Sequence, residues 1–362
     1  MQAIVLAAGL GTRLSPLTSA IPKALLPIAN VPLIDYAVDS IRGVGIKDII
    51  VVTGYLGLMT AKYLEASAKR SAAEIKCITA ERYKEGPIYS LLAAERFVKD
   101  DFLLIPADLV LDNKILSKLV ANPSEKDMIY AATSERALQP QRAFILCCKR
   151  SGHANSTILR FCLPESEDEK SQEDRKNQPI SSIGAVICPR RIFKYVNHAA
   201  ENGSKRVIDA LNEYVAQTGL GRCVTVNSQY QWFDVDTIGD MLEANCYILT
   251  ERLAKSGNQG HLYLDRETSV TVGVHKNNGH DQPARFLGPV LMGKGCVIGE
   301  SSIIGPCVSI QDNCFIGRHA RISKAIILSE SVIDDSASVN RAVVRGKKAL
   351  RAGRHGRDAK NE

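Results

Sequence analysis

The sequence predicts an α/β protein with a mostly parallel sheet, followed in the last third of the chain by a short parallel β-helix. From residue 1 to about 110, short apolar runs alternate with amphipathic stretches, which is the pattern of buried strands joined by crossover helices. Between residues 286 and 333, large aliphatic residues recur every six positions, a period that neither a helix nor an isolated sheet produces. A chain of 362 residues also exceeds what one core usually spans, so two domains are expected.

The first predicted strand ends in a glycine turn. Gly9 and Gly11 have no Cβ, which lets backbone N–H groups approach phosphate oxygens. Arg13 and Lys23 add a planar fork of donors and a mobile point charge, the pair expected around a polyphosphate. Two common phosphate loops are excluded, because Leu14 stands where the dinucleotide fingerprint needs a third glycine and no Gly-Lys-Ser/Thr occurs. The turn therefore predicts a site for a nucleoside triphosphate.

Two further buried strands are predicted at residues 49–53 and 102–105. Gly54 and Asp108 follow the ends of these strands, as Gly9 follows the end of the first. Ligands of such sheets bind beyond the carboxyl ends of the strands, so these positions indicate one shared pocket.

Carboxylates in two segments are candidates for holding Mg²⁺, which prefers one or two carboxylates beside phosphate oxygens and water. Asp108 follows a buried strand, whereas Asp234 lies in the segment 232–237, where Asp236 is a close rival. Other roles stay open, since Asp108 suits a turn or a helix cap and the 234/236 pair suits the cap of a helix through Met241.

The six-residue period in the last third predicts coils of about 18 residues, each with three flat faces. One large and one small residue would point inward at every face. At the large position stand Met292, Ile298, Ile304, Ile310, Ile316, Ile322 and Leu328, and two residues earlier stand Val290, Cys296, Ser302, Val308, Cys314, Ala320, Ile326 and Val332. The register is lost near Asp334, and His319 is interpreted as a surface residue. We assign this domain to packing and assembly, and expect a homo-oligomer formed through it.

The net charge of +7 comes almost entirely from the end of the chain. Residues 341–362 hold eight lysines or arginines against Asp358 and Glu362, which is typical of a solvated, disordered end. A nucleic-acid partner is therefore not expected.

The 10 cysteines are scattered without a Cys-x-x-Cys pair, which predicts a reduced, cytoplasmic protein with buried thiols. No apolar run approaches the roughly 20 residues of a membrane helix, and no signal peptide is expected.

The whole string from Gly9 to Ile28 closely resembles the signature of the nucleotidylyltransferases that activate sugar 1-phosphates, the NDP-sugar pyrophosphorylases. The six-residue period resembles the hexapeptide repeat of left-handed β-helices. The resemblance implies a Rossmann-like nucleotidyltransferase domain that transfers an NMP from an NTP to a sugar 1-phosphate, releases pyrophosphate and uses Mg²⁺.

The resemblance also implies roles for individual residues. Arg13 and Lys23 would be catalytic, and Asp108 and Asp234 would bind the metal, with Asp236 as an alternative. Gly184 stands where the family has an Asn-Ala-Gly that touches the sugar. The implied nucleotide-binding residues are Leu6, Ala8, Gly9, Gly11, Thr12, Gly86 and Ser90.

The sequence departs from the family on the side of the acceptor. Leu163 replaces the lysine of the usual Glu-Lys-Pro, and Lys149 or the basic residues of 170–176 are the candidate replacements. Pro87 replaces a threonine in the base-binding segment, whose Tyr-Ser-Leu ending is more like cytidylyltransferases of alcohol phosphates such as inositol or choline phosphate.

Two alternatives to the NDP-sugar reaction therefore remain. One is a cytidylyltransferase acting on an alcohol phosphate. The other is a non-catalytic regulatory subunit, because the segment 19–27 also resembles the γ and ε subunits of the translation initiation exchange factor.

Four segments are predicted along the chain. Residues 1–250 form the nucleotidyltransferase domain, 251–285 a linker, 286–345 the β-helix and 346–362 a basic disordered tail. The stretch 165–178 has no apolar residue and is interpreted as an exposed loop.

Overall fold

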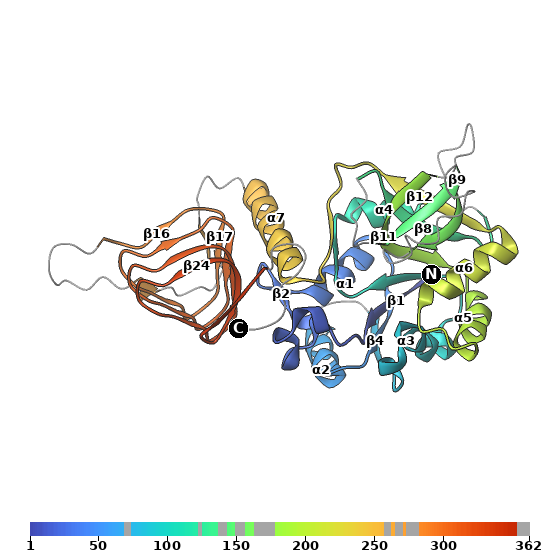
Figure 1. The fold of residues 1–362 in the computed structure, drawn as a ribbon, viewed down its shortest axis with the longest axis horizontal. Helices are drawn as coiled ribbons and strands as arrows, with labels where there is room; N and C mark the ends of the chain where they lie inside the picture. Colours follow the sequence, from blue (N-terminus) through green and yellow to red (C-terminus); the bar gives the residue numbers. More distant parts are fainter. Residues whose placement is uncertain are drawn as a thin grey trace. The chain divides into compact units, whose positions relative to one another are not determined.

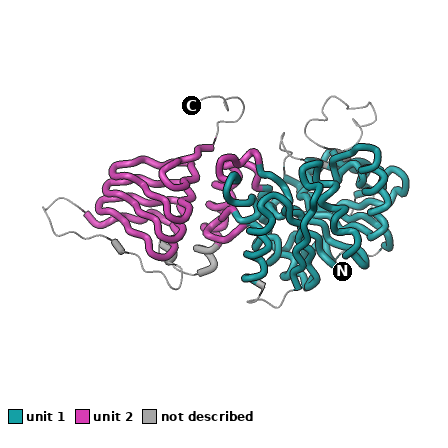
Figure 2. The backbone as a smooth tube through the Cα atoms, turned by 90° about the horizontal axis from the view of Figure 1, so that it is seen from below, with its two compact units in different colours: residues 1–11, 18–25, 33–234 teal, residues 12–17, 26–32, 235–362 magenta. Residues whose placement is uncertain are grey.

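The computed structural model describes residues 1–68, 74–121, 125–136, 143–148, 156–162, 178–256, 262–264, 271–272 and 282–352. The chain divides into two compact units, coloured separately in Figure 2. The first unit comprises residues 1–11, 18–25 and 33–234, and the second comprises residues 12–17, 26–32 and 235–362. Residues 165–177 of the predicted loop at 165–178 lie outside the described residues, as do the candidates Lys149 and 170–176. Of the predicted tail at 346–362, residues 348–351 form a strand, and residues from 353 onward lie outside the described residues.

The first unit is built on a nine-stranded sheet with the order β5-β4-β1-β6-β11-β8-β12-β10-β9 (Figure 1). Its strands are β1 (Gln2–Ala7), β4 (Asp48–Thr53), β5 (Glu74–Thr79), β6 (Phe102–Pro106), β8 (Ile129–Ser134), β9 (Phe144–Cys148), β10 (Thr157–Cys162), β11 (Gln178–Cys188) and β12 (Gly221–Val226). Strands β5, β4, β1 and β6 are parallel, and so are β8 and β12, whereas β9, β10 and β11 run antiparallel to their neighbours. The predicted α/β, Rossmann-like architecture is confirmed.

Helices cover both faces of this sheet. They are α1 (Leu33–Gly43), α2 (Gly57–Ala68), α3 (Pro87–Ala94), α4 (Asn113–Val120), α5 (Ile192–Glu201) and α6 (Val207–Thr218). Successive residues of β1 point to opposite faces, so Ala3 and Val5 join the core under α1 and α4, whereas Ile4 joins the core under α3, α5 and α6. Burial on both faces explains why these strands are uninterrupted apolar runs in the sequence.

Short segments complete the first unit. Two more strands, β7 (Leu109–Leu111) and β13 (Trp232–Asp234), form an antiparallel pair. Single turns of 3₁₀ helix span Lys23–Leu25, Tyr83–Glu85 and Glu95–Phe97 in the first unit. A further turn, Thr12–Leu14, belongs to the second unit's segment 12–17, and Leu17–Ser19 begins at the last residue of that segment.

The second unit contains the predicted parallel β-helix. Its strands are β14 (Leu262–Leu264), β15 (Thr271–Val272), β16 (Arg285–Phe286), β17 (Val290–Met292), β18 (Val297–Ile298), β19 (Ile303–Ile304), β20 (Val308–Ile310), β21 (Phe315–Ile316), β22 (Arg321–Ile327), β23 (Val332–Ile333), β24 (Ser338–Arg345) and β25 (Lys348–Arg351). Partners such as Val290 and Val308, or Val297 and Phe315, are 18 residues apart, which is the predicted length of a coil. Strands β14 and β15 pair with β17 and β18, so the stretch interpreted as a linker contributes strands to this unit.

The six-residue register first changes earlier than the sequence suggested. Ile310 pairs with Ile327, not with the predicted Leu328, and Ile327 lies in the interior cluster. Corner residues with left-handed φ follow every six positions up to His319, and the next one, Lys324, comes after only five. This corner is therefore one residue shorter, and so is the later corner that ends at Arg341, five positions after Ser336. Strand β24 continues the stack beyond Asp334.

Helix α7 (Ile238–Ser256) belongs to the second unit and packs on the strands β20, β22 and β24. The hairpin of β2 (Pro27–Ile28) and β3 (Val31–Pro32) also contacts this helix. The fully buried Asn245 Oδ1 accepts hydrogen bonds from the Ala29 N–H at 2.9 Å and the Ser309 hydroxyl at 2.8 Å. Asn245 thus joins three parts of the second unit that are far apart in the sequence.

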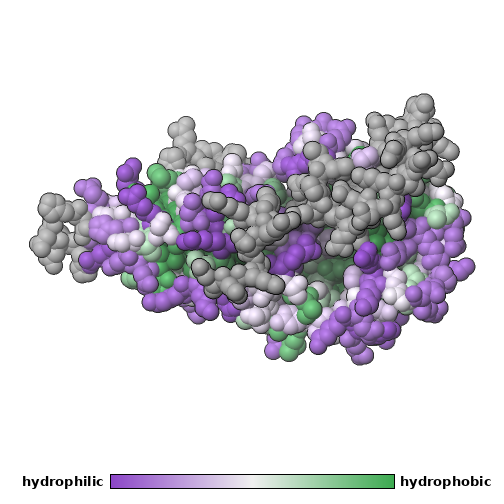
Figure 3. All heavy atoms as spheres, viewed as in Figure 1, coloured by the Kyte–Doolittle hydropathy of each residue, from purple (hydrophilic) through white to green (hydrophobic). Residues whose placement is uncertain are grey.

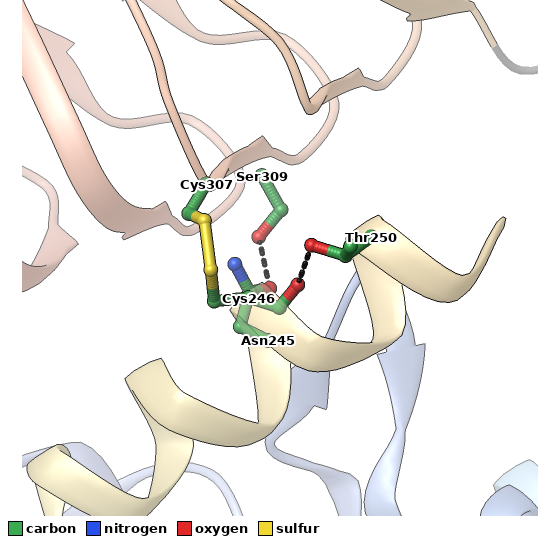
Figure 4. Close-up of a disulfide and its surroundings, with 5 residues drawn as sticks. All are labelled: Asn245, Cys246, Thr250, Cys307 and Ser309. Carbon is green, nitrogen blue, oxygen red and sulfur yellow. Dashed lines mark hydrogen bonds between the residues drawn. A yellow bond between two sulfur atoms is a disulfide. The ribbon is translucent and has the colours of Figure 1, made fainter. Parts of the chain in front are cut away.

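A disulfide between Cys246 and Cys307 lies beside this contact (Figure 4). The expectation of a protein without disulfides is wrong for this pair. Sequence spacing could not reveal it, because only the packing of α7 brings two cysteines 61 positions apart to a Cα–Cα distance of 4.8 Å. The other cysteines that the structure describes in full are free thiols.

The face drawn in Figure 3 is largely hydrophilic, with apolar residues in small groups. Among the described residues, no helix has the length and apolar character needed to cross a membrane.

Candidate active site

The candidate site of the first unit lies at the carboxyl ends of β1, β4 and β6. Leu6 pairs with Val52 on one side and Pro106 on the other, so the three strands end together. Beyond these ends, the Leu6 carbonyl accepts from the Ala107 N–H at 3.0 Å and the Ala8 carbonyl accepts from the Tyr55 N–H at 3.2 Å. Leu6 and Ala8 thus act here through their backbone, and the strand ends form one edge, as the sequence indicated.

Lys23 and Asp108 form an ion pair at this edge. Lys23 opens the turn Lys23–Leu25, and Asp108 stands two residues beyond β6. The Lys23 ammonium donates to Asp108 Oδ2, and the two side chains are only 14% and 20% exposed. Partial burial reduces the screening of such a pair by water.

Asp234 joins Asp108 because β13 pairs with β7, which places Asp234 opposite Leu109. A carboxylate oxygen of Asp108 lies within 4.8 Å of one from Asp234. Asp108 Oδ1 is buried and has no hydrogen-bond partner among the residues that the structure describes. Two carboxylates at this spacing, one with an unsatisfied buried oxygen, fit a small divalent cation such as Mg²⁺.

Other residues cap the helices that the sequence left open as partners of these carboxylates. Helix α4 is capped by Asp112, whose side chain accepts from the Lys114 N–H at 2.9 Å. At the start of α7, Thr237 Oγ1 accepts from the Asp240 N–H, while Asp240 accepts from the Thr237 N–H.

The glycine turn adjoins Lys23. Gly11 has φ +63°, and a Cβ there would lie 2.9 Å from Thr18 Cγ2 and 3.1 Å from Lys23 Cβ, so only glycine fits without a shift. The Thr18 hydroxyl donates to the Gly11 carbonyl at 3.0 Å and fixes the turn. A Cβ at Gly9 would meet nothing within 4 Å, so the backbone there borders open space.

The segment from Gly86 to Ser90 is held by the first turn of α3. Gly86 has φ +143°, and a Cβ would come within 2.5 Å of the Lys205 carbonyl oxygen, which requires glycine. Ser90 is buried on α3, with 3% of its surface exposed. Beside them, Arg82 stacks 4.0 Å over the Tyr89 ring and binds Glu85 at 2.7 and 2.8 Å, which holds the pKa of Glu85 below its usual range.

Arg13 and Asp236 form an ion pair within the second unit. Arg13 Nη1 lies 3.0 Å from Asp236 Oδ2, with side chains 67% and 26% exposed. Thr12 begins the same 3₁₀ turn, and its carbonyl accepts from the Ser15 N–H at 3.1 Å. Asp234 therefore lies near Asp108 in the first unit, whereas Asp236 pairs with Arg13 in the second.

Gly184 and Arg136 lie further along the carboxyl edge of the first unit. Gly184 has φ +89° in a bulge of β11, where the pairing with β8 shifts between Ser182 and Val186. Arg136 stands two residues beyond β8, and its Nη1 donates to the Trp232 carbonyl at 3.4 Å. Sequence reasoning missed Arg136; the available signal was a basic residue just past the end of a buried strand.

The fold and the carboxylates at the strand ends define an α/β domain suited to binding a nucleotide and a metal. Residues 3–220 match the family model of the MobA-like NTP transferase domain, and the chain belongs to this family. Residues 286–354 match the model of the GMPPB C-terminal domain.

Relatives extend over most of the chain. It is 24% identical to the bifunctional protein GlmU of Methanococcus maripaludis over 95% of this chain and 77% of the relative. It is also 24% identical to a glucose-1-phosphate thymidylyltransferase of Streptomyces griseus, over 95% and 92%.

Solved structures share the fold. A UDP-glucose pyrophosphorylase complexed with UDP-glucose has a TM-score of 0.58 at 20% identity, over 69% of this chain and 99% of that chain. A UDP-glucose pyrophosphorylase from Acinetobacter baumannii has a TM-score of 0.57 at 18% identity, over 71% and 99%.

Proposed function

We propose that this chain is a nucleotidylyltransferase that transfers an NMP from an NTP to a sugar 1-phosphate. A phosphate oxygen of the acceptor attacks the α-phosphorus, pyrophosphate leaves and an NDP-sugar forms. The observation that carries the proposal is the placement of Lys23 beside Asp108 and Asp234 at the carboxyl ends of the parallel strands. The family membership and the names of the relatives support the same reaction.

The NTP would be bound by the turn at Gly9 and Gly11, with Lys23 at its phosphates. Gly9 borders open space, and Lys23 is held against Gly11, so an anion at the turn would meet both N–H groups and an ammonium. Arg13 is proposed as the second cation, since its exposed guanidinium can neutralise charge on the leaving pyrophosphate.

Asp108 and Asp234 are proposed to hold Mg²⁺. When bound, the ion would supply positive charge to the phosphate oxygens of the NTP. This chain's own residues would then orient the two substrates in line and neutralise the charge that builds up during transfer. Asp236 is the alternative ligand, and Leu6, Ala8, Thr12, Gly86 and Ser90 are proposed to line the nucleotide site.

The test is a substrate panel. The full chain is incubated with Mg²⁺, each of five NTPs and a set of sugar 1-phosphates with inositol and choline phosphates, and pyrophosphate release is measured. Release that requires an NTP, a sugar 1-phosphate and Mg²⁺ is expected. Release only with the alcohol phosphates would replace the acceptor class, and nucleotide binding without release from any pair would favour a non-catalytic subunit.

We also propose that the chain forms a homo-oligomer through the β-helix. Val297, Phe315 and Val332 stack on neighbouring strands of one outer face, and the first two are 40% and 46% exposed. An apolar ladder in water is stabilised by a second copy of the same face. Light scattering should give a lower mass for Val297→Glu/Phe315→Glu than for Leu58→Glu, which changes an exposed leucine of the first unit. Equal masses would contradict the proposal.

A further inference from the structure

We infer that Arg136 binds the phosphate of the acceptor substrate and so selects a phosphate monoester over the free sugar. The inference rests on the proposed function and names a residue for the binding of the acceptor, the substrate for which the sequence departs from the family. It starts from the order of the strands at the carboxyl edge of the first unit.

The candidate groups lie along that edge in the order of the strands that carry them. Strand β11 is antiparallel to both β6 and β8, so β6 and β8 are parallel and their carboxyl ends share one edge. Asp108 stands two residues beyond β6, and Arg136 stands two residues beyond β8. Along β1, β6, β11 and β8 the edge therefore carries the glycine turn, the carboxylate, Gly184 and the arginine.

The spacing suits a second phosphate. Neighbouring strands lie about 4.8 Å apart, so the strands that carry Asp108 and Arg136 are separated by about 10 Å. An NTP at the glycine turn occupies the β1 side of Asp108. Arg136 is on the opposite side, where an acceptor that attacks the α-phosphorus has to lie.

The bulge of β11 places a glycine between the two groups. Gly184 has no side chain, takes a left-handed φ, and a Cβ there would come no closer than 3.8 Å to Pro106. No side chain of residue 184 therefore covers the backbone between Asp108 and Arg136, which favours the approach of a sugar there.

Arg136 is held in place by its surroundings. Its backbone carbonyl accepts from the Ser181 hydroxyl at 3.2 Å, and its N–H donates to Ser134 Oγ at 3.3 Å. Its Nη1 bond to the Trp232 carbonyl ties the guanidinium to β13, two residues from Asp234. A planar guanidinium anchored to the strand of a proposed metal ligand offers the paired donors that phosphate oxygens prefer.

The electrostatics require such a cation. A phosphate monoester carries between one and two negative charges at neutral pH, and it would approach two carboxylates at this edge. A permanently charged arginine on the acceptor side offsets that repulsion. Leu163, at the position where a lysine was sought, supplies no charge.

The experiment compares Arg136→Gln and Arg136→Lys with Arg222→Gln. Arg222 is a matched control because it is also partly buried and bonded to a hydroxyl and a carbonyl, but it lies at the amino end of β12. For Arg136→Gln, we expect KM for the sugar 1-phosphate to rise roughly 10- to 100-fold, the range for losing a charged hydrogen bond. KM for the NTP should stay within twofold, and Arg136→Lys should be intermediate.

Direct binding separates this inference from the proposed function. Glucose 1-phosphate and free glucose are titrated against wild type and each variant by ligand-observed NMR, with NTP affinity as the test of folding. Weakened binding of the phosphate alone in Arg136→Gln supports the inference even without turnover. Wild-type glucose 1-phosphate affinity in a variant that still binds NTP would overturn it, whatever the outcome of the substrate panel.

Discussion

At the scale of single residues, Asp108 carries the largest consequences. One of its oxygens takes the Lys23 ammonium, and the other is buried near Asp234 with no described partner. Asparagine keeps the shape but removes the charge. We expect Asp108→Asn to lower the rate of pyrophosphate release by a hundredfold or more and to raise the Mg²⁺ concentration needed for half-maximal rate.

The matched control is Asp112→Asn, four residues further on. Asp112 caps α4, and asparagine caps a helix about as well as aspartate, so rate and stability should remain near wild type. Both rates are measured at saturating substrates together with a denaturant unfolding curve. A near-wild-type rate for Asp108→Asn would remove this aspartate from the site.

The same residues illustrate what sequence could predict at this scale. Gly9 and Asp108 follow apolar runs that indicate buried strands, so their position at one edge of the sheet could be predicted from the strand ends alone. The position of Arg136 at this edge could not be predicted, because it depends on β11 running antiparallel between β6 and β8. No periodicity in the sequence indicates the direction of β11.

At the scale of elements, Asn245 decides how α7 is fixed. Its side-chain oxygen serves both the Ala29 N–H and the Ser309 hydroxyl, and all three are fully buried. Asn245→Ala leaves two buried donors without an acceptor, so we expect a loss of about 2–4 kcal/mol in the free energy of unfolding. Chemical denaturation measures it.

Thr250→Ala is the control on the same helix. Among the residues that the structure describes, the exposed Thr250 hydroxyl bonds only to the Cys246 carbonyl, so removing it should cost less than about 0.5 kcal/mol. Similar losses in the two variants would mean that the buried acceptor is unimportant.

The β-helix shows where element-level prediction stops. The six-residue period followed from the sequence because each face buries one large side chain, from Met292 to Ile322. The sequence did not predict that Ile327 takes the inward position after Ile322, because the adjacent aliphatic residues Ile327 and Leu328 satisfy the pattern equally well. The shorter corner at Lys324 makes the choice, and it is a backbone property.

At the scale of the whole chain, the Cys246–Cys307 disulfide closes a loop of 61 residues. Such a crosslink restricts the unfolded chain, and the loop-closure model gives about 4 kcal/mol for this length. We therefore expect a reducing agent, or Cys246→Ser, to lower the unfolding midpoint of the second unit. Denaturation curves recorded with and without dithiothreitol measure this change.

Cys77→Ser provides the comparison, since Cys77 is a half-buried free thiol of the first unit. Its midpoint should respond to dithiothreitol as the wild type does, whereas Cys246→Ser should not respond at all. An unfolding curve of the wild type that is identical under oxidising and reducing conditions would contradict this prediction.

The chain passes back and forth between the two units within its first 33 residues, with 12–17 and 26–32 in the second unit and 18–25 in the first. Neither unit is thus a contiguous module that evolution or a protease could detach cleanly at residue 234. A chain that ended there would keep the segments 12–17 and 26–32 but lose the rest of the unit against which they pack.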